Sequence, residues 1–336
     1  MTAGAVQSRP TLIDPFGRAI NYLRISVTDR CDFRCIYCMA EQTTFLPRAQ
    51  LLTLEEIATI AAAFVELGVT KIRVSGGEPL ARANVISLLT TLGGLPGLNE
   101  LTLTTNGARL ARYAQALRAA GVRRLNISLD SLQPARFQAI TRTGELEQVL
   151  AGIAAAQAAG FERIKLNTVV LANRNDDELV DLVQFAVARG LDISFIEEMP
   201  LGELADHQPE ASRCSSDQVL AKVSEVFDLL PSTETTGGPS RYYRLAGTAS
   251  RLGLIAPHSH NFCAQCNRVR LTTEGQLVLC LGQADAVDLK RVLRAHPDNP
   301  GALAAAIRGA IARKPYGHHF AGEQPLDYRY MHMTGG

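Results

Sequence analysis

The sequence lacks any marked excess of charge. Its 336 residues include 34 Lys and Arg against 33 Asp and Glu, which leaves a formal net charge of +1. A protein that binds nucleic acid through bulk positive charge is therefore not expected. Hydrophobic residues make up 46% of the chain and charged residues 20%, which excludes a disordered chain, because such chains are poor in apolar residues. At roughly 150 residues per domain, we expect about two domains, or one large α/β domain with an appendage.

Long hydrophobic runs are missing as well. The longest uncharged apolar stretch without a glycine runs from Ile57 to Val65, far short of the roughly 20 residues that span a bilayer. The first residues, MTAGAVQSRPTLIDPFG, contain no apolar signal-peptide core. We expect a cytoplasmic protein whose partners include neither a membrane nor a nucleic acid.

Short β-branched runs alternate with longer amphipathic segments through the first two-thirds of the chain. No G-x-G-x-x-G sequence follows the first run, so a dinucleotide-binding fold is not indicated. The alternation predicts an α/β fold with a parallel sheet, which we interpret as a partial, incomplete TIM-type βα barrel of about six strands. The predicted strands are Tyr22–Val27, Lys71–Ser75, Glu100–Thr104, Arg124–Leu129, Arg163–Val170 and Asp192–Glu197. Helices are predicted after the capping box Thr53-x-x-Glu56, over Asp176–Arg189 and near Ser216–Phe227.

The pattern changes in the last third of the chain. The glycine- and threonine-rich stretch 231–240, PSTETTGGPS, is typical of a linker. Beyond it, Arg268–Thr272 and Gln276–Cys280 predict a β-hairpin, and a helical region is predicted over Ala286–Arg313. We therefore expect a barrel domain over residues 1–230 and a smaller C-terminal domain over residues 231–336.

The chain has seven cysteines, one fewer than two complete four-cysteine clusters need. An odd number without an export signal argues against a disulfide framework. Cys214 has no partner at a ligand spacing, and we interpret it as an incidental thiol. The other six form two trios, Cys31-x3-Cys35-x2-Cys38 and Cys263-x2-Cys266-x13-Cys280.

Both trios have spacings that suit iron–sulfur clusters. Thiolates hold such clusters, and a [4Fe–4S] cluster with three of them keeps one iron open to a small molecule. Two incompletely ligated clusters facing one cavity are thus our main interpretation. A structural zinc site made from four of the six thiolates is the alternative, because C-x2-C is also a zinc spacing.

Unusual residues follow most of the predicted strands. In a parallel βα barrel the site lies at the carboxyl ends of the strands. An ordinary βα turn would explain each feature alone, but their joint position beside the first cysteine trio predicts one site. The features are Gly76-Gly77-Glu78-Pro79, Thr105-Asn106-Gly107, Ser128 with Asp130, and Glu197 to Pro200.

Basic residues also lie on the predicted strands. Lys165 lies in the apolar strand RIKLNTVV, where a lysine is costly unless it faces a polar interior or an anion. Arg268 and Arg270 are two positions apart on one strand, so they face the same side. Arginine and lysine side chains of this kind suit an anionic ligand.

These motifs resemble those of the radical S-adenosylmethionine superfamily. Cys31-x3-Cys35-x-Tyr37-Cys38, followed by Gly76-Gly77-Glu78-Pro79, is similar to the superfamily pattern. More narrowly, the chain resembles the GTP 3',8-cyclase family of molybdenum cofactor biosynthesis. That likeness is carried by LRISVTDRC from Leu23 onward, by Cys263-x2-Cys266-NRVRLT, by Cys280 and by the terminal Gly335-Gly336.

The resemblance implies two [4Fe–4S] clusters and S-adenosylmethionine as cofactors. The first cluster lies on Cys31, Cys35 and Cys38 in the barrel, and the second on Cys263, Cys266 and Cys280 in the C-terminal domain. S-adenosylmethionine is implied to contact Tyr37, Gly77, Glu78, Ser128 and Met199. GTP is implied to contact Arg24, Arg73, Thr104, Lys165, Arg268, Val269 and Arg270. The implied catalytic residues are Arg268, Arg270 and a tail, Gly335 and Gly336, that reaches into the active site.

The same resemblance implies the reaction and its partners. A lyase of this family converts GTP and S-adenosylmethionine to (8S)-3',8-cyclo-7,8-dihydroguanosine 5'-triphosphate, 5'-deoxyadenosine and methionine. It needs an electron donor, is a homodimer, and is followed in the pathway by cyclic pyranopterin monophosphate synthase. The alternatives are another radical enzyme with an auxiliary cluster, such as a peptide-modifying one, and a non-catalytic zinc or iron–sulfur module.

Two positions depart from the family pattern. Ser194 stands where the family usually has arginine, so one triphosphate contact is missing or comes from elsewhere, for instance from Arg189 or Arg213. Ala40 stands where proline is common, and we expect this change to matter little.

Overall fold

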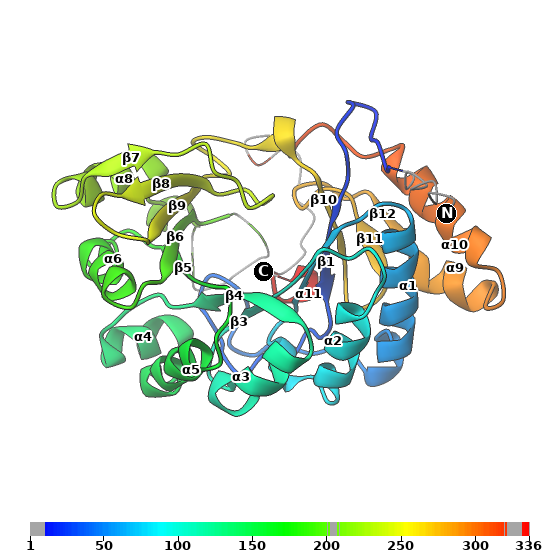
Figure 1. Cartoon of the computed structure of the whole chain (residues 1–336), viewed down its shortest axis with the longest axis horizontal. Coiled ribbons are helices and arrows are strands. Elements are labelled where there is room, and N and C mark those ends of the chain that lie inside the picture. The colour runs from blue at the N-terminus through cyan, green and yellow to red at the C-terminus, as the bar shows by residue number, and fades with distance from the viewer. Residues whose placement is uncertain are drawn as a thin grey trace, which may run out of the picture.

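The computed structural model describes residues 11–199, 201, 207, 209–318, 320 and 331–335. In this part of the chain, one twelve-stranded sheet curves around a central space, and helices cover its outer side (Figure 1). The predicted strands are confirmed, with bounds that differ by at most two residues. They are β1 (Tyr22–Ser26), β2 (Lys71–Ser75), β3 (Glu100–Thr105), β4 (Val122–Ser128), β5 (Arg163–Val170) and β6 (Asp192–Glu197).

The parallel part of the sheet is wider than the six strands predicted. Two strands from the last third of the chain, β9 (Arg251–Ile255) and β10 (Arg268–Leu271), pair in parallel with β6 and β1. Antiparallel strands continue the sheet on both sides: β11 (Gln276–Val278) and β12 (Ala286–Asp288) beyond β10, β8 (Arg241–Leu245) and β7 (Leu229–Pro231) beyond β9. The parallel pairings of β9 with β6 and of β10 with β1 join distant segments, so local periodicity did not reveal them.

Two of the outer helices start at capping boxes, which satisfy free backbone N–H groups at the helix start. Thr53 and Glu56 form the predicted capping box at the start of α1 (Leu54–Glu66). Ser215 and Gln218 form a second capping box at α8 (Ser216–Ser224). The other helices in the first two-thirds of the chain are α2 (Val85–Gly93), α3 (Leu110–Ala119), α4 (Pro134–Thr141), α5 (Leu146–Ala158), α6 (Leu179–Ala188) and the short α7 (Pro209–Ser212).

The region predicted as helical over Ala286–Arg313 is divided into three elements, which corrects the prediction. It starts as β12, and Asp288 then accepts a hydrogen bond from the Arg291 N–H to cap α9 (Leu289–Ala295). Asn299 caps the next helix, α10 (Pro300–Ile311). The predicted hairpin before it is confirmed, because β10 and β11 pair antiparallel. None of the described helices is long and apolar enough to cross a membrane.

Strand alternation separates the packed core from the central space. In β1, Leu23 and Ile25 are fully buried members of the hydrophobic core, whereas Arg24 between them lines a cavity. The same alternation places Leu166 in the core and Lys165 at the cavity. The fold thus directs polar side chains from several strands into the space that the sheet encloses.

Candidate active site inside the curved sheet

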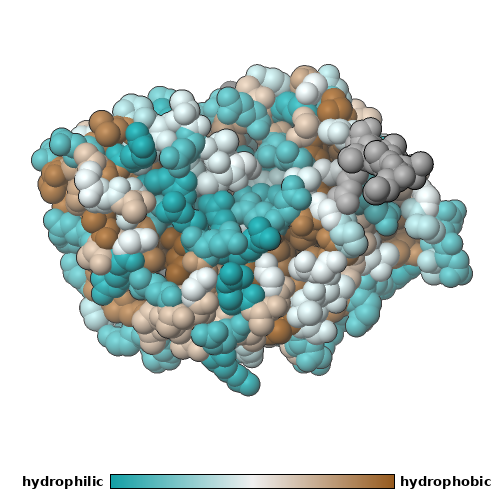
Figure 2. Space-filling model, in the orientation of Figure 1, coloured by the Kyte–Doolittle hydropathy of each residue, from teal (hydrophilic) through white to brown (hydrophobic). Residues whose placement is uncertain are grey.

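A large cavity lies on the inner side of the sheet, and both cysteine trios line it. It encloses about 2140 Å³ of space, open solvent at its mouth included. Hydrophilic side chains gather near the centre of the face that Figure 2 shows. The two cysteine trios therefore share one cavity, as the sequence interpretation requires.

The first trio lies on the loop that follows β1. The Cys38 N–H donates to the Cys35 carbonyl at 2.9 Å, and the Phe33 N–H donates to Cys31 Sγ at 3.4 Å. Burial raises the pKa of the Cys31 and Cys35 thiols above their usual range, and it raises the pKa of Cys38 to about 12. Such thiols become thiolates when a metal replaces the proton.

The second trio is assembled by the hairpin. Cys263 lies on a short 3-10 helix (Cys263–Gln265), Cys266 precedes β10, and Cys280 follows β11. Burial raises the pKa of Cys280. Burial also opposes ionisation of Cys266, but the charges of Arg268 and Lys314 outweigh it and lower the pKa of Cys266.

The donor chemistry of both trios fits an iron–sulfur cluster. Each trio is three cysteines, the soft ligands that such clusters use. Within the described ranges, no three His, Cys, Asp or Glu side chains are arranged to hold a single metal ion. The cysteines of a cubane bind different irons and need not converge on one point. Cys214 packs in the hydrophobic core and does not line the cavity.

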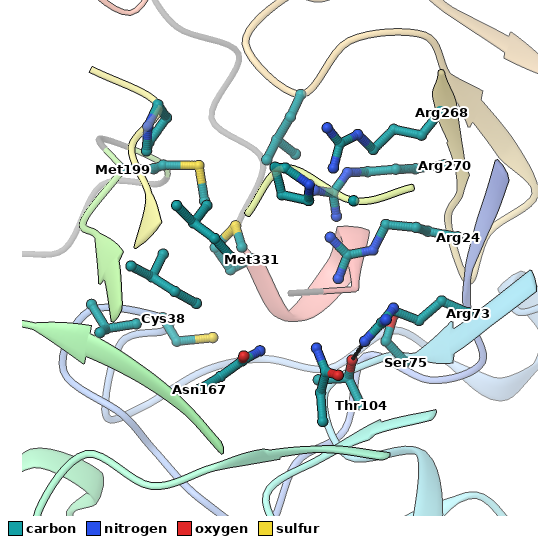
Figure 3. Close-up of a pocket in the computed structure, with 18 of the residues that line it drawn as sticks. Arg24, Cys38, Arg73, Ser75, Thr104, Asn167, Met199, Arg268, Arg270 and Met331 are labelled. Atoms are coloured by element: carbon teal, nitrogen blue, oxygen red, sulfur yellow. Dashed lines mark hydrogen bonds between the residues drawn. The ribbon is translucent and has the colours of Figure 1, made fainter. Parts of the chain in front are cut away.

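Four arginines form one wall of the cavity. The register of β10, β1 and β2 places Arg24 between Arg270 and Arg73, with Arg268 two residues before Arg270. Figure 3 shows their side chains directed into the same space, opposite Cys38 and Met199. We call Arg24, Arg73, Arg268 and Arg270 the arginine wall.

The arginine wall carries charge that the described residues do not neutralise. None of its members forms an ion pair with a carboxylate in that part of the chain, and Arg24 Nε is buried without a hydrogen-bond partner there. Burial and the charge of Arg270 hold the pKa of Arg24 well below its usual range. Burial and the charge of Arg268 lower the pKa of Arg270 to about 10. Uncompensated buried cations are costly, so the wall calls for an anionic ligand.

The positive charge of the arginine wall lowers the pKa of Tyr22. Its hydroxyl accepts a hydrogen bond from Arg73 Nε at 2.6 Å. Burial acts to raise the pKa of Tyr22, but the charges of Arg73 and Arg24 lower it to about 7. Arg73 Nη1 donates a hydrogen bond to Thr104 Oγ1 at 3.1 Å (Figure 3). Arg73 is therefore held in place from two sides.

Lys165 adds a further cation from β5. Its Nζ donates to Ser240 Oγ and to the Tyr242 hydroxyl, each at 3.3 Å. Burial lowers the pKa of Lys165. Two residues along the strand, Asn167 Oδ1 is buried without a hydrogen-bond partner in the described structure. This side of the cavity therefore also presents polar groups to a ligand.

The residues predicted to contact S-adenosylmethionine lie near the first trio. Tyr37, Gly77, Ser128 and Met199 line the cavity, and the Tyr37 hydroxyl donates to Asp130 at 2.6 Å. A side chain at Gly77 would overlap the Arg30 backbone carbonyl, so only glycine fits there.

The side chain of Glu78, the fifth residue predicted to contact S-adenosylmethionine, points away from the cavity. It is fully buried and is not among the cavity-lining residues. Its carboxylate accepts hydrogen bonds from the N–H groups of Leu80 and Asn106 and from Thr105 Oγ1, at 2.7 to 2.9 Å. Burial raises the pKa of Glu78 to about 7, against the effect of these donors. Glu78 holds the loops after β2 and β3 together behind the cavity wall.

The C-terminal segment reaches the arginine wall. After α11 (Met331–Thr334), the Gly335 carbonyl accepts hydrogen bonds from Arg270 Nη1 at 3.2 Å and from Ser75 Oγ at 3.1 Å. In Figure 1 this end of the chain lies inside the curve of the sheet. Gly336, the other predicted tail residue, lies outside the described residues.

Arg189 and Arg213 do not replace the arginine that the family usually has at position 194, because the structure places both away from the site. Ser194 is fully buried on β6, with its Oγ 3.4 Å from Ser240 Oγ. A Cβ at Gly253, on the neighbouring strand, would overlap Ser194 Oγ. Arg189 and Arg213 are exposed, and neither lines the cavity.

Sequence reasoning missed several residues that line the cavity. The inward-facing Tyr22, Asn126 and Asn167 lie two residues from Arg24, Ser128 and Lys165, so strand alternation from the predicted residues would have found them. Lys314 follows α10 and carries no such signal. The other missed residues include Ser75, Phe262 and Met331.

The curved parallel sheet and the cysteine loop after β1 define a radical S-adenosylmethionine protein. Residues 25–186 match the family model of the radical SAM superfamily, and residues 191–320 match the model Molybdenum Cofactor Synthesis C. The crystal structure of Streptococcus suis SuiB bound to S-adenosylmethionine has a similar fold, with a TM-score of 0.61 and 14% sequence identity. That match covers 87% of this chain and 68% of the other.

Curated relatives narrow the assignment. The chain is 60% identical over 326 residues to the GTP 3',8-cyclase of Ectopseudomonas mendocina, which covers 97% of this chain and 98% of the relative. It is 57% identical to GTP 3',8-cyclase 2 of Pseudomonas aeruginosa, with the same coverage. The chain belongs to the GTP 3',8-cyclase family of the radical SAM superfamily. Membership implies S-adenosylmethionine and one [4Fe–4S] cluster.

Proposed function

We propose that this chain converts GTP and S-adenosylmethionine to (8S)-3',8-cyclo-7,8-dihydroguanosine 5'-triphosphate, with release of 5'-deoxyadenosine and methionine. This is the first step of molybdenum cofactor biosynthesis. The observation that carries the proposal is the arginine wall, which lacks carboxylate partners in the described structure and faces the first cysteine trio across one cavity. A nucleoside triphosphate supplies the negative charge that this wall needs.

The residues divide the work by position. Cys31, Cys35 and Cys38 would hold the first cluster, and the cavity residues next to them would bind S-adenosylmethionine. When bound, these two groups supply the one-electron chemistry that removes a hydrogen atom from the substrate. The protein's part is to bind the substrate, to orient it towards this end of the cavity and to exclude water.

Binding of the triphosphate falls to the cations. Arg24, Arg73 and Lys165 come from three strands of one sheet, so their positions relative to one another are set by strand register. Thr104 and Tyr22 hold Arg73 in one orientation. Arg270 bonds the Gly335 carbonyl, so it would orient the tail beside the substrate. A preorganised set of donors loses little entropy when the ligand binds.

The remaining assignments rest on the family likeness and on cavity position. We propose a second [4Fe–4S] cluster on Cys263, Cys266 and Cys280, with its open iron towards the guanine. On the same grounds we propose Val269, Arg268 and Gly336 as site residues. We also propose that residues 1–230 and 231–336 form two domains. An external electron donor, a homodimer and cyclic pyranopterin monophosphate synthase as the next enzyme in the pathway complete the proposal.

Anaerobic incubation with dithionite, S-adenosylmethionine and GTP tests the substrate. We expect 5'-deoxyadenosine and a cyclised guanosine triphosphate in equal amounts, measured by chromatography and mass spectrometry. A parallel reaction with ATP should give no modified nucleotide. Release of 5'-deoxyadenosine without any modified guanosine would reject GTP as the substrate and leave the radical class intact.

A Lys165→Met variant should bind GTP more weakly. Loss of one buried charge-assisted hydrogen bond to phosphate costs roughly 1.5–3 kcal/mol, so we expect KM for GTP to rise about 10- to 100-fold. Lys222→Met is the matched control, because Lys222 pairs with Asp176 outside the cavity. The measurement is the initial rate of cyclised product at varied GTP. An unchanged KM in Lys165→Met would exclude Lys165 from triphosphate binding.

A further inference from the structure

Lys314 is a buried cation that lies beside the second cysteine trio. It follows α10, is 2% exposed, and lines the cavity together with Cys263, Cys266 and Cys280. Its Nζ donates a hydrogen bond to the Leu279 backbone carbonyl at 2.8 Å, one residue before Cys280. Family resemblance did not single out this residue, and neither did any sequence motif.

Lys314 has no carboxylate in the described structure to balance its charge. Its Nζ donates to a backbone carbonyl, which is neutral. Arg18 is buried to a similar degree but pairs with Asp14 at 2.6 Å. Burying an ammonium group without an opposite charge is expensive. The site of Lys314 therefore needs an anion from within the cavity.

The anion available at that place is the cysteine trio. Cys280 directly follows the Leu279 carbonyl that Lys314 binds, and all three cysteines line the cavity together with Lys314. Three thiolates on a [4Fe–4S]²⁺ core carry a net charge of −1, and the one-electron reduced cluster carries −2. A single lysine offsets one of these charges.

We propose that Lys314 is the counter-charge of the second cluster, acting as a positioning residue that favours its assembly and its reduced state. This inference rests on the proposed second cluster. Lys314 makes no bond to iron in this proposal; it acts through the field at the thiolates and through the backbone next to Cys280.

Hydrogen bonds fix the segment that follows Lys314. The Arg18 guanidinium donates to the carbonyls of Cys263 and Tyr316 at 2.6 Å and of Pro315 at 2.8 Å. It thereby ties the residues after Lys314 to the loop that carries Cys263. A Cβ at Gly317 would lie 3.0 Å from Cys263 Sγ, which shows how closely this segment approaches the trio.

The test isolates the second cluster in the full-length chain. A background in which Cys31, Cys35 and Cys38 are all changed to Ala is reconstituted anaerobically with iron and sulfide. About four irons per chain are expected to remain. Lys314→Gln, which keeps a donor for the Leu279 carbonyl but removes the charge, is compared with Lys314→Arg, which keeps the charge. The measurements are iron content and an electron-paramagnetic-resonance redox titration.

We expect Lys314→Gln to disfavour the reduced cluster by about tenfold, a shift of 59 mV to lower potential for a one-electron couple, while Lys314→Arg stays near the parent. Loss of iron from Lys314→Gln alone would also support the counter-charge. An unchanged potential and iron content in Lys314→Gln would overturn it, as would equal losses in both variants. Absence of iron from the background protein itself would instead reject the second cluster.

Discussion

A Cys35→Ala variant should lose S-adenosylmethionine cleavage by at least about 1,000-fold. Cys35 is the middle member of the first trio, and it is half-buried in the loop after β1. With one of three thiolates gone, two ligands remain for a four-iron cluster, and no spare cysteine lines the cavity near them in the described structure. Iron should fall from about eight to about four per chain. The measurements are 5'-deoxyadenosine release and iron analysis.

Two other cysteine variants make this result interpretable. Cys214→Ala should keep both iron and activity, because Cys214 packs in the core away from the cavity. Cys280→Ala should lose the iron of the second trio and form no cyclised product, but it should still cleave S-adenosylmethionine. Normal cleavage by Cys35→Ala, or loss of all iron from Cys280→Ala, would contradict the assignment of one cluster to each trio.

A Gly335→Ala variant should form cyclised product about 100-fold more slowly, equivalent to roughly 2.7 kcal/mol in the barrier. Gly335 has a φ of +78°, a conformation that alanine adopts only with strain, and an added methyl would overlap Ser75 Oγ. The Gly335 carbonyl would then lose its bonds to Ser75 and Arg270. Both clusters should persist, because the atoms nearest to the added methyl belong to Ser75 and Ser26 and not to a cysteine.

Gly309→Ala is the matched control for the tail. Gly309 lies in α10, where an added methyl meets nothing within 4 Å, so product formation should not change. Iron content and the initial rate with saturating GTP are measured for both variants. Full activity of Gly335→Ala would show that the contact between the tail and Arg270 is not needed for turnover.

The directions of the charged side chains near the site were predicted unevenly from the sequence. Lys165 was recognisable because a charged residue interrupts an apolar strand, and the structure directs it into the cavity. Glu78 followed a strand in the same motif as Gly77, yet the chain turns it away from the cavity to bond Leu80, Thr105 and Asn106. A motif defines spacing along the chain, whereas the direction of each side chain depends on how the loops pack.

The sequence alone determined the type and place of the first six strands, the capping box at Thr53 and the two cysteine spacings. Each of these features depends on neighbours within a few residues. Only the tertiary structure decided that β10 pairs with β1, which brings Arg268 and Arg270 beside Arg24. It also decided that Lys314 meets the Leu279 carbonyl beside Cys280 and that Gly335 meets Ser75. These contacts join segments tens to hundreds of residues apart, and such pairs form only when burial of the whole core offsets the entropy of closing the chain between them.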